Sequence, residues 1–227
     1  GGRVRSHSHL PSVRCFEDQK ITETWQLDGK QAVDFEKICI YTDTLRHGDT
    51  VAAGLALCRD FGGMTFDRMA AWQKAYLKEF WATALVAIEG PSTLTEGLAF
   101  NVFHLLQSVG KEKHSNICAK GLSGEGYEGH YFWDTEIFIF PFFLLTMPDI
   151  ARNLLAYRHT VLPYALQNAR TLGHKKGALF SWRTITGPEC SGYFPAGTAQ
   201  YHISGDVAYA VQSYYQVTRD HDFMLQM

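Results

Sequence analysis

The sequence predicts a mainly α-helical protein that begins with a few β-strands. From Asp49 onward, apolar residues recur at three- and four-residue spacing, which is typical of the buried face of a helix. Before about residue 45, apolar and polar residues alternate instead, as in strands with one buried face. The helical segments alternate with long loops and show no repeat or heptad, which favours part of an α-helical barrel.

The predicted strands are short and lie in the first 45 residues. A few such strands are not stable alone, so they indicate a larger sheet. Asp28-Gly29 separates the last two strands and has the composition of a turn. The strand segments are Val13–Phe16, Ile21–Leu27 and Ala32–Tyr41.

Three helices are predicted next, and glycine follows each of them. Gly62-Gly63 ends the first helix, Gly90-Pro91 closes the connection after the second, and Gly110 ends the third. The three helices are expected over Thr50–Cys58, Thr65–Ala84 and Ser92–Ser108.

Further helices are predicted in the second half, on either side of a long loop. Pro141 should kink the first of them or loosen its first turn, and the second should bend before Pro163. The loop His174–Gln200 is rich in Gly, Pro and Ser, and long ordered loops in compact helical domains are usually functional. The helices are expected over Asp134–Thr146, Pro148–Thr171, His202–Arg219 and from His221 onward.

Composition argues against several classes of function. The net charge is −2 and no basic run is present, so we expect neither nucleic acid nor an anionic membrane as a partner. The longest apolar run, Ile137–Met147, is too short to span a bilayer. The five scattered cysteines form no C-x-x-C pair, and no H-E-x-x-H motif occurs, so we predict free thiols and no metal site.

A glycine-rich loop that runs into three aromatic residues and an aspartate is the strongest candidate site. Gly121-Leu-Ser-Gly-Glu-Gly-Tyr-Glu-Gly-His130 contains four glycines, which can adopt positive φ and let a ligand approach the backbone. Trp133 offers a flat apolar face and Asp134 offers acceptors for hydroxyl donors, a combination that suits a sugar ring. The alternative is structural, with Asp134 capping the helix and Trp133 filling the core.

The same loop formally fits a dinucleotide-binding pattern, G-x-G-x-x-G, between Gly124 and Gly129. We reject that interpretation because no β-strand precedes the glycines in a βαβ arrangement. In addition, Glu125 and Glu128 would repel a pyrophosphate.

Three ordered blocks resemble glycoside hydrolase family 65, whose members are mostly inverting phosphorylases of α-glucosides such as maltose, trehalose, kojibiose and nigerose. The resemblance covers essentially the whole chain, though weakly before about residue 60. It implies a catalytic (α/α)6 toroid preceded by a β-sandwich. We therefore expect a β-sandwich remnant at 1–45, a helical linker at 46–90 and the truncated first half of the toroid at 91–227, with apolar faces left exposed. The blocks are Asn116–Glu136, Gly177–Cys190 and Tyr193–Ile203.

The resemblance also implies roles for individual residues. Trp133 and Asp134 match positions that contact glucose in the −1 subsite. Trp182 and Arg183 match a second aromatic and a variable residue that shape that sugar and the acceptor side. Some members carry Glu in place of Arg183, so this departure bears on which disaccharide is used; the alternative is that Arg183 is a surface cation. Further substrate-binding candidates in the loops are Glu189, His130 and Gln200.

An inverting phosphorylase needs one carboxylic acid, because phosphate itself is the nucleophile. The family's general acid, a Glu, and its phosphate-binding elements are expected downstream of Met227, so we predict no catalytic residue within the chain and no activity for the chain alone. Four other glutamates do not match the acid's motif: Glu125, Glu128, Glu136 and Glu189.

The implied reaction converts an α-linked glucose disaccharide and phosphate, with inversion, into β-glucose 1-phosphate. Inorganic phosphate is then a co-substrate, and no cofactor is expected. The family often forms dimers, so a homodimer is an open possibility. A sugar phosphate does not cross membranes, which favours the cytoplasm. Two alternatives remain open at this stage, a family 65 α-glucoside hydrolase and a non-catalytic helical sugar-binding module.

Overall fold

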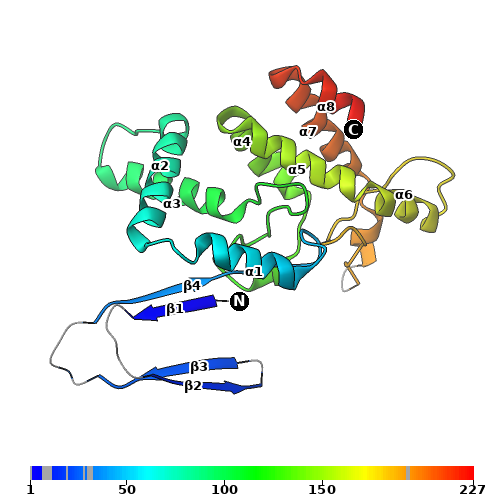
Figure 1. The fold of residues 1–227 in the computed structure, drawn as a ribbon. Coiled ribbons are helices and arrows are strands. Elements are labelled where there is room, and N and C mark those ends of the chain that lie inside the picture. The colour runs from blue at the N-terminus through cyan, green and yellow to red at the C-terminus, as the bar shows by residue number, and fades with distance from the viewer. Residues whose placement is uncertain (1, 7–11, 19, 28, 30–32, 193–194) are drawn as a thin grey trace. The chain divides into compact units, whose positions relative to one another are not determined.

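The chain is mainly helical, with its strands confined to the first 40 residues, which confirms the predicted fold class (Figure 1). The computed structural model describes residues 2–6, 12–18, 20–27, 29, 33–192 and 195–227. It contains two compact units, Gly1–Lys78 and Glu79–Met227. The predicted domain boundaries after residues 45 and 90 stay predictions.

Four described strands form two antiparallel pairs in the first unit. β1 (Gly2–Ser6) pairs with β4 (Phe35–Cys39), and β2 (Ser12–Glu17) pairs with β3 (Lys20–Trp25). The three predicted strand segments each overlap a described strand, whereas β1 was not predicted. Ala32, the first residue of the third segment, lies outside the described residues. Asp28 lies outside the described residues, and Gly29 next to it has the positive φ of a turn glycine, +72°.

The first three helices follow the predicted segments closely. At the start of α1 (Thr50–Phe61), the carboxylate of Asp49 accepts the backbone N–H groups of Val51 and Ala52 at 3.0 and 2.9 Å. This is the capping arrangement that satisfies the free N–H groups of a helix start. α2 covers Phe66–Ala84 and α3 covers Ser92–Ser108.

The apolar helix predicted over Asp134–Thr146 is two elements. Thr135–Ile139 forms a π-helical turn (labelled η2), and α4 (Phe140–Thr146) follows with Pro141 in its first turn. Proline lacks an N–H group, so an α-helical hydrogen bond cannot form across this point, and the loosening expected at Pro141 is confirmed. The next predicted helix is also divided in front of its proline, into α5 (Pro148–Thr160) and α6 (Leu162–Thr171).

The core of the second unit is formed where α4, α5, the Thr135–Ile139 turn and α7 (His202–Thr218) pack together (Figure 1). α8 (His221–Gln226) follows α7 after the left-handed residue Arg219. This packing fixes the ends of the two loops that carry the predicted site residues. Fully buried apolar side chains of the core include Phe143, Leu155, Ile203 and Ala210.

Other features of the described residues concern membranes, metals and thiols. Among the helices that the structure describes, none combines the length and the apolar character needed to cross a bilayer. Within the same residues, which exclude His7 and His9, no three potential metal ligands lie together. All five cysteines are free thiols.

Candidate functional site

Four described residues of the glycine-rich loop have positive φ angles, in the left-handed region. Gly121 and Gly129 have φ values of +54° and +75°, as the glycine content led us to expect. Two residues with side chains share this conformation, since Tyr127 and Glu128 have φ values of +61° and +53° in a 3-10 turn (labelled η1, Gly126–Gly129). Left-handed backbone is unfavourable for such residues, so surrounding contacts must hold the turn.

Trp133 and Asp134 lie at the junction between this loop and the Thr135–Ile139 turn. Asp134 has helical backbone angles, but its side chain caps nothing, is exposed and accepts no hydrogen bond from any described residue. The Trp133 ring is half-buried and packs edge to face against His202 at a centroid distance of 4.8 Å. The geometry therefore supports neither the capping role for Asp134 nor the core role for Trp133.

A buried arginine on α5 fixes both sides of this junction. Arg158 donates to both carboxylate oxygens of Glu136, at 2.7 Å from Nε and 2.6 Å from Nη2, and to the carbonyl of Phe132 at 3.3 Å. The Arg158 and Glu136 side chains are each 1% exposed. Burial lowers the pKa of Arg158, but the charge and hydrogen bonds of Glu136 outweigh this effect and raise it. Both carboxylate oxygens of Glu136 are therefore occupied by Arg158.

The second loop is attached to the first by backbone hydrogen bonds. Tyr131 and Thr184 exchange two N–H···O bonds, of 2.7 and 3.2 Å, as an isolated β-bridge. The hydroxyl of Tyr157, on α5, donates to the carbonyl of Ile185 at 2.8 Å. Burial raises the pKa of Tyr157, which keeps this hydroxyl protonated and able to donate. The two blocks of sequence thus form one structure at the end of α5.

Glu189 holds the second loop together from within. One carboxylate oxygen accepts the N–H of Trp182 at 2.6 Å, and the other accepts those of Ser191 and Arg183 at 3.0 and 3.3 Å. The carboxylate thus accepts hydrogen bonds from backbone N–H groups that have no strand or helix partner in this irregular loop. The indole of Trp182 packs edge to face on Phe132, at 5.3 Å between ring centroids, which places it beside the Trp133 junction.

Arg183 is fixed by residues of the glycine-rich loop. Its Nη2 donates to Glu128 at 3.0 Å and lies 3.2 Å from Nδ1 of His130. The Arg183 side chain is 13% exposed, so it is not a freely solvated surface cation. His130 Nδ1 also lies 2.8 Å from the carbonyl of Tyr127, so its tautomer decides which of the two contacts is a hydrogen bond.

His202, at the start of α7, is a site residue that the sequence analysis missed. Its Nδ1 lies 2.7 Å from the carboxylate of Asp206 and its Nε2 lies 3.0 Å from Oε1 of Gln200. Because the same ring packs on Trp133, it connects Gln200 to the junction. A single histidine at a helix start carries no motif, although the i, i+4 spacing to Asp206 could have indicated the pair.

The predicted site residues therefore form three local groups in the second unit. His130 and Arg183 are in contact, Glu189 braces the backbone beside Trp182, and Gln200 reaches Trp133 through His202. Asp134 stands alone at the exposed junction. The roles predicted for these residues in binding substrate stay predictions.

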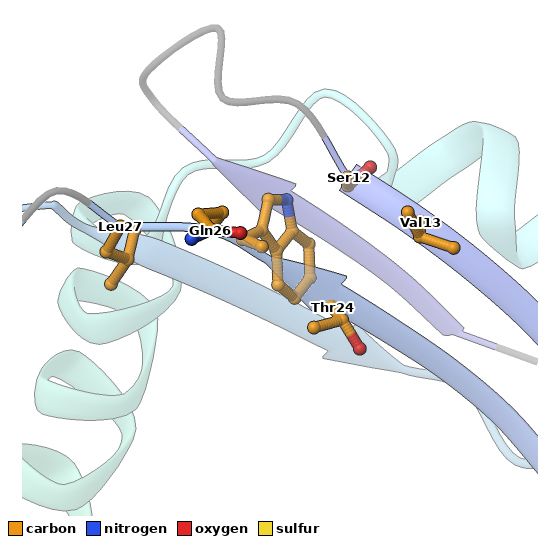
Figure 2. A pocket seen from close by; sticks show the side chains of 6 residues that line it. Ser12, Val13, Thr24, Gln26 and Leu27 are labelled. Atoms are coloured by element: carbon orange, nitrogen blue, oxygen red, sulfur yellow. The ribbon is translucent and has the colours of Figure 1, made fainter.

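Two hollows are lined by described residues of the first unit, where none of the predicted site residues lies. One follows the β2–β3 hairpin (Figure 2), and no side chain in its lining titrates. The other lies between β4 and the start of α2 and includes Glu36, which accepts the N–H of Phe66 at 3.0 Å. The first hollow is lined by Ser12, Val13, Thr24, Trp25, Gln26 and Leu27.

Comparison with known proteins gives consistent similarities. Residues 99–227 match the family model of the glycosyl hydrolase family 65 central catalytic domain. The α,α-trehalose phosphorylase of Geobacillus stearothermophilus is 60% identical over 189 residues, which are 83% of this chain and 25% of that protein. The kojibiose phosphorylase of Caldanaerobacter subterraneus is 41% identical over 179 residues, covering 73% of this chain and 23% of that protein.

A solved structure from the human microbiome, provisionally named a kojibiose phosphorylase, has the same fold. Its TM-score is 0.79 at 23% identity, and the match covers 98% of this chain and 30% of that one. The chain thus spans about a quarter of the length of the curated relatives that it matches.

Proposed function

The chain belongs to glycosyl hydrolase family 65, and on that basis we propose that it forms part of a disaccharide phosphorylase. The proposed reaction cleaves an α-linked glucose disaccharide with inorganic phosphate and inverts the anomeric centre to give β-glucose 1-phosphate. Trehalose is the first substrate to test, because a relative named trehalose phosphorylase is more similar, at 60% identity, than one named kojibiose phosphorylase, at 41%.

The observation that carries this proposal is that Arg158 holds the residues on either side of the Trp133–Asp134 pair. The Asp134 carboxylate has no partner among the described residues, although Arg158 bonds the carbonyl of Phe132 before it and the carboxylate of Glu136 after it. An exposed acceptor beside a half-buried indole suits a glucose ring, whose C–H face packs on the aromatic ring while its hydroxyls donate to the carboxylate. Binding groups that are held in place before the substrate arrives lose little entropy on binding.

We propose that the proton for the leaving oxygen comes from elsewhere in the protein. Glu136 is paired with Arg158, and Glu189 is surrounded by backbone N–H groups. Glu125 and Glu128 are solvent-exposed side chains of the glycine-rich loop. We infer that a carboxylic acid outside residues 1–227 protonates the leaving sugar while phosphate attacks from the opposite face.

We also make proposals on the co-substrate, the compartment and the oligomeric state of the enzyme. Phosphate is a co-substrate, and we propose no cofactor. A product that retains the energy of the glycosidic bond as a sugar phosphate is useful where it is made, so we place the enzyme in the cytoplasm. A homodimer is the assembly that we propose to test first.

Phosphorolysis by the full-length protein tests the function. The protein is incubated with phosphate and, separately, with trehalose, kojibiose, nigerose and maltose, and the products are followed by NMR. We expect β-glucose 1-phosphate from trehalose and none from the 227-residue chain alone. Equal release of free glucose without phosphate would identify a hydrolase instead. Sugar binding without any product from the full-length protein would identify a binding module.

A further inference from the structure

His202, the first residue of α7, has an imidazole ring that three other side chains hold in place. Its Nδ1 lies 2.7 Å from a carboxylate oxygen of Asp206, one turn further along α7, and its Nε2 lies 3.0 Å from Oε1 of Gln200. The ring itself packs on Trp133, with 4.8 Å between the ring centroids and 88° between the ring planes. The His202 side chain is nevertheless 48% exposed, so solvent reaches a ring that is fixed in position.

The two polar contacts fix the plane of the imidazole in either protonation state. A carboxylate only accepts hydrogen bonds, so Asp206 keeps a proton on Nδ1. Gln200 can present its amide oxygen to a protonated Nε2 or, after the amide turns over, its NH2 group to an unprotonated one. His202 is therefore held at both ring nitrogens.

Stability alone does not explain this arrangement. A histidine and a carboxylate four residues apart on a helix, with the histidine half-exposed, contribute little to the free energy of unfolding, because water screens the charges. The contact with Trp133 has a different character, since edge-to-face aromatic pairs attract in a preferred relative orientation. A fixed imidazole therefore constrains the plane of the indole.

The indole of Trp133 depends on such contacts for its orientation. Its N–H group donates to no described residue. Its ring meets those of Phe138, at 5.9 Å between centroids, and of His202, at 4.8 Å. Phe138 is itself 68% exposed, whereas α7 packs in the core of the second unit. His202 thus connects the indole to the most firmly packed part of the structure.

We propose that His202 is a positioning residue, whose imidazole, held by Asp206 and Gln200, keeps the Trp133 indole in the plane on which the glucose ring packs. The inference rests on the proposed phosphorylase function, because it requires Trp133 to contact the sugar. It differs from a structural role in its effect on the kinetics. A structural role would lower the fraction of folded enzyme and therefore kcat. A misplaced indole would weaken ground-state and transition-state binding alike, which raises the KM for the disaccharide and leaves kcat unchanged.

The test uses the full-length protein with His202→Ala, His202→Phe, Asp206→Ala and the double variant that carries both alanines. His221→Ala is the matched control, because His221 is also an exposed histidine at the start of a helix and packs edge to face on an aromatic ring, that of Tyr215, at 5.2 Å. The measurements are kcat and KM for the disaccharide that the wild type cleaves fastest, the KM for phosphate and the thermal unfolding midpoint. Fluorine NMR of protein labelled with fluorotryptophan, with the Trp133 signal assigned from Trp133→Phe, reports the surroundings of the indole.

We expect His202→Ala to raise the KM for the disaccharide about two- to tenfold, the size of a lost edge-to-face contact. The kcat and the KM for phosphate should stay those of the wild type, and the unfolding midpoint should fall no further than in His221→Ala. The fluorine signal of Trp133 should shift or broaden in His202→Ala and not in His221→Ala. His202→Phe should restore part of the KM, because it keeps an aromatic ring against the indole.

Asp206→Ala tests whether the carboxylate acts through the imidazole. It should raise the KM for the disaccharide in the wild-type background and leave it unchanged in the His202→Ala background. Asp206 has a second connection to the site, because burial lowers the pKa of Arg158 and the charge of Asp206 is one of those that raise it. An effect that passes through Arg158 would persist when His202 is alanine.

Three results would overturn the inference while leaving the proposed function intact. One is a wild-type KM for the disaccharide in His202→Ala. Another is a lower kcat with an unchanged KM and an unfolding midpoint below that of His221→Ala, which is the pattern of a structural role. The third is an effect of Asp206→Ala that has the same size in both backgrounds. Absence of phosphorolysis in the wild-type protein with every disaccharide would instead remove the proposed function, and this inference with it.

Discussion

At the scale of single residues, the described site separates side chains that hold the loops from side chains that remain available to a ligand. Glu136 accepts hydrogen bonds from Arg158, and Glu189 accepts them from backbone N–H groups of its own loop. Asp134 makes no such contact. Substitutions at these positions should therefore affect stability and activity to different degrees.

Replacement of Asp134 by Asn should reduce activity without reducing stability. The side chain is exposed and unpartnered, so the free energy of unfolding should change by no more than about 0.5 kcal/mol. Loss of a charged acceptor for sugar hydroxyls should lower kcat/KM by about 100-fold or more. Steady-state phosphorolysis and thermal unfolding of the full-length protein check both expectations. Asp222→Asn, an exposed change on α8, is the control, and equal losses in the two variants would contradict the role of Asp134.

Replacement of Gly197 by Ala should disturb Trp182. A methyl group at this position would lie 2.6 Å from the Trp182 ring and 3.1 Å from Ser191, closer than carbon atoms normally approach. We expect the ring to shift and the KM for the disaccharide to rise several-fold. Gly205→Ala is the matched control, because its methyl group meets no atom and removal of a helical glycine should stabilise α7 by about 1 kcal/mol. An unchanged KM in Gly197→Ala would show that Trp182 does not contact the substrate.

At the scale of elements, α5 is the support on which both loops depend. Arg158 holds the glycine-rich loop and Tyr157 holds the second loop, from adjacent positions near the end of the helix. The π-helical turn Thr135–Ile139 starts one residue after Asp134 and brings Glu136 inward to Arg158. π-turns of this kind are frequent at functional sites.

Replacement of Arg158 by Met should destabilise the second unit by about 3–5 kcal/mol, because it leaves the Glu136 carboxylate buried without a partner. Adding Glu136→Leu should restore most of the loss, since replacing both members of a buried pair by apolar residues is often close to neutral. Urea unfolding of the full-length variants, followed by pulse proteolysis, measures both effects. A double variant as unstable as Arg158→Met would show that the loss arises from packing rather than from the unpaired charge.

The start of α8 should contribute stability that disappears in acid. The N–H of Phe223, the hydroxyl of Tyr214 and the guanidinium of Arg152 all bond to Asp220 and lower its pKa below the ordinary value of 3.8. A lowered pKa stabilises the folded state above that value, and the contribution is lost as the pH falls below it.

Asp220→Asn isolates this effect, because asparagine caps a helix about as well as aspartate but carries no charge. Thermal unfolding midpoints of the two proteins, measured from neutral pH downward, should converge as the pH falls below 3.8. A constant difference across that range would mean that the Asp220 charge has no role in stability.

Individual elements show what the sequence could predict. α3 occupies the predicted residues Ser92–Ser108 because its apolar spacing and the proline and glycine at its ends are local signals. The π-turn was not predictable, since its apolar spacing resembles that of an α-helix. The pairing of Arg158 with Glu136 was not predictable either, because it joins residues 22 apart whose burial depends on how the helices pack.

At the scale of the whole molecule, large apolar side chains remain exposed on several helices of the second unit. Phe138 is 68% exposed, Leu145 on α4 is 76% exposed, and Tyr209 on α7 is 60% exposed. A helical protein normally buries such faces against further elements. The expected exposure of apolar faces is therefore present in the structure.

We expect the 227-residue chain on its own to bind the dye ANS strongly and to self-associate as its concentration rises. Exposed apolar surface drives both effects. Dye fluorescence and sedimentation velocity, compared with the full-length protein at equal concentration, test this expectation. Weak dye binding and a monomeric sedimentation coefficient at all concentrations would contradict it.

The bridge between Tyr131 and Thr184 also has a consequence for the order in which the protein folds. It joins two segments that are separated by all of α4, α5 and α6. The entropy lost in closing so long a loop must be recovered from contacts that already exist, and those contacts come from the helices inside the loop. We therefore expect the two halves of the site to meet late in folding, after α5 has packed, so that an error in that helix would hinder assembly of the site.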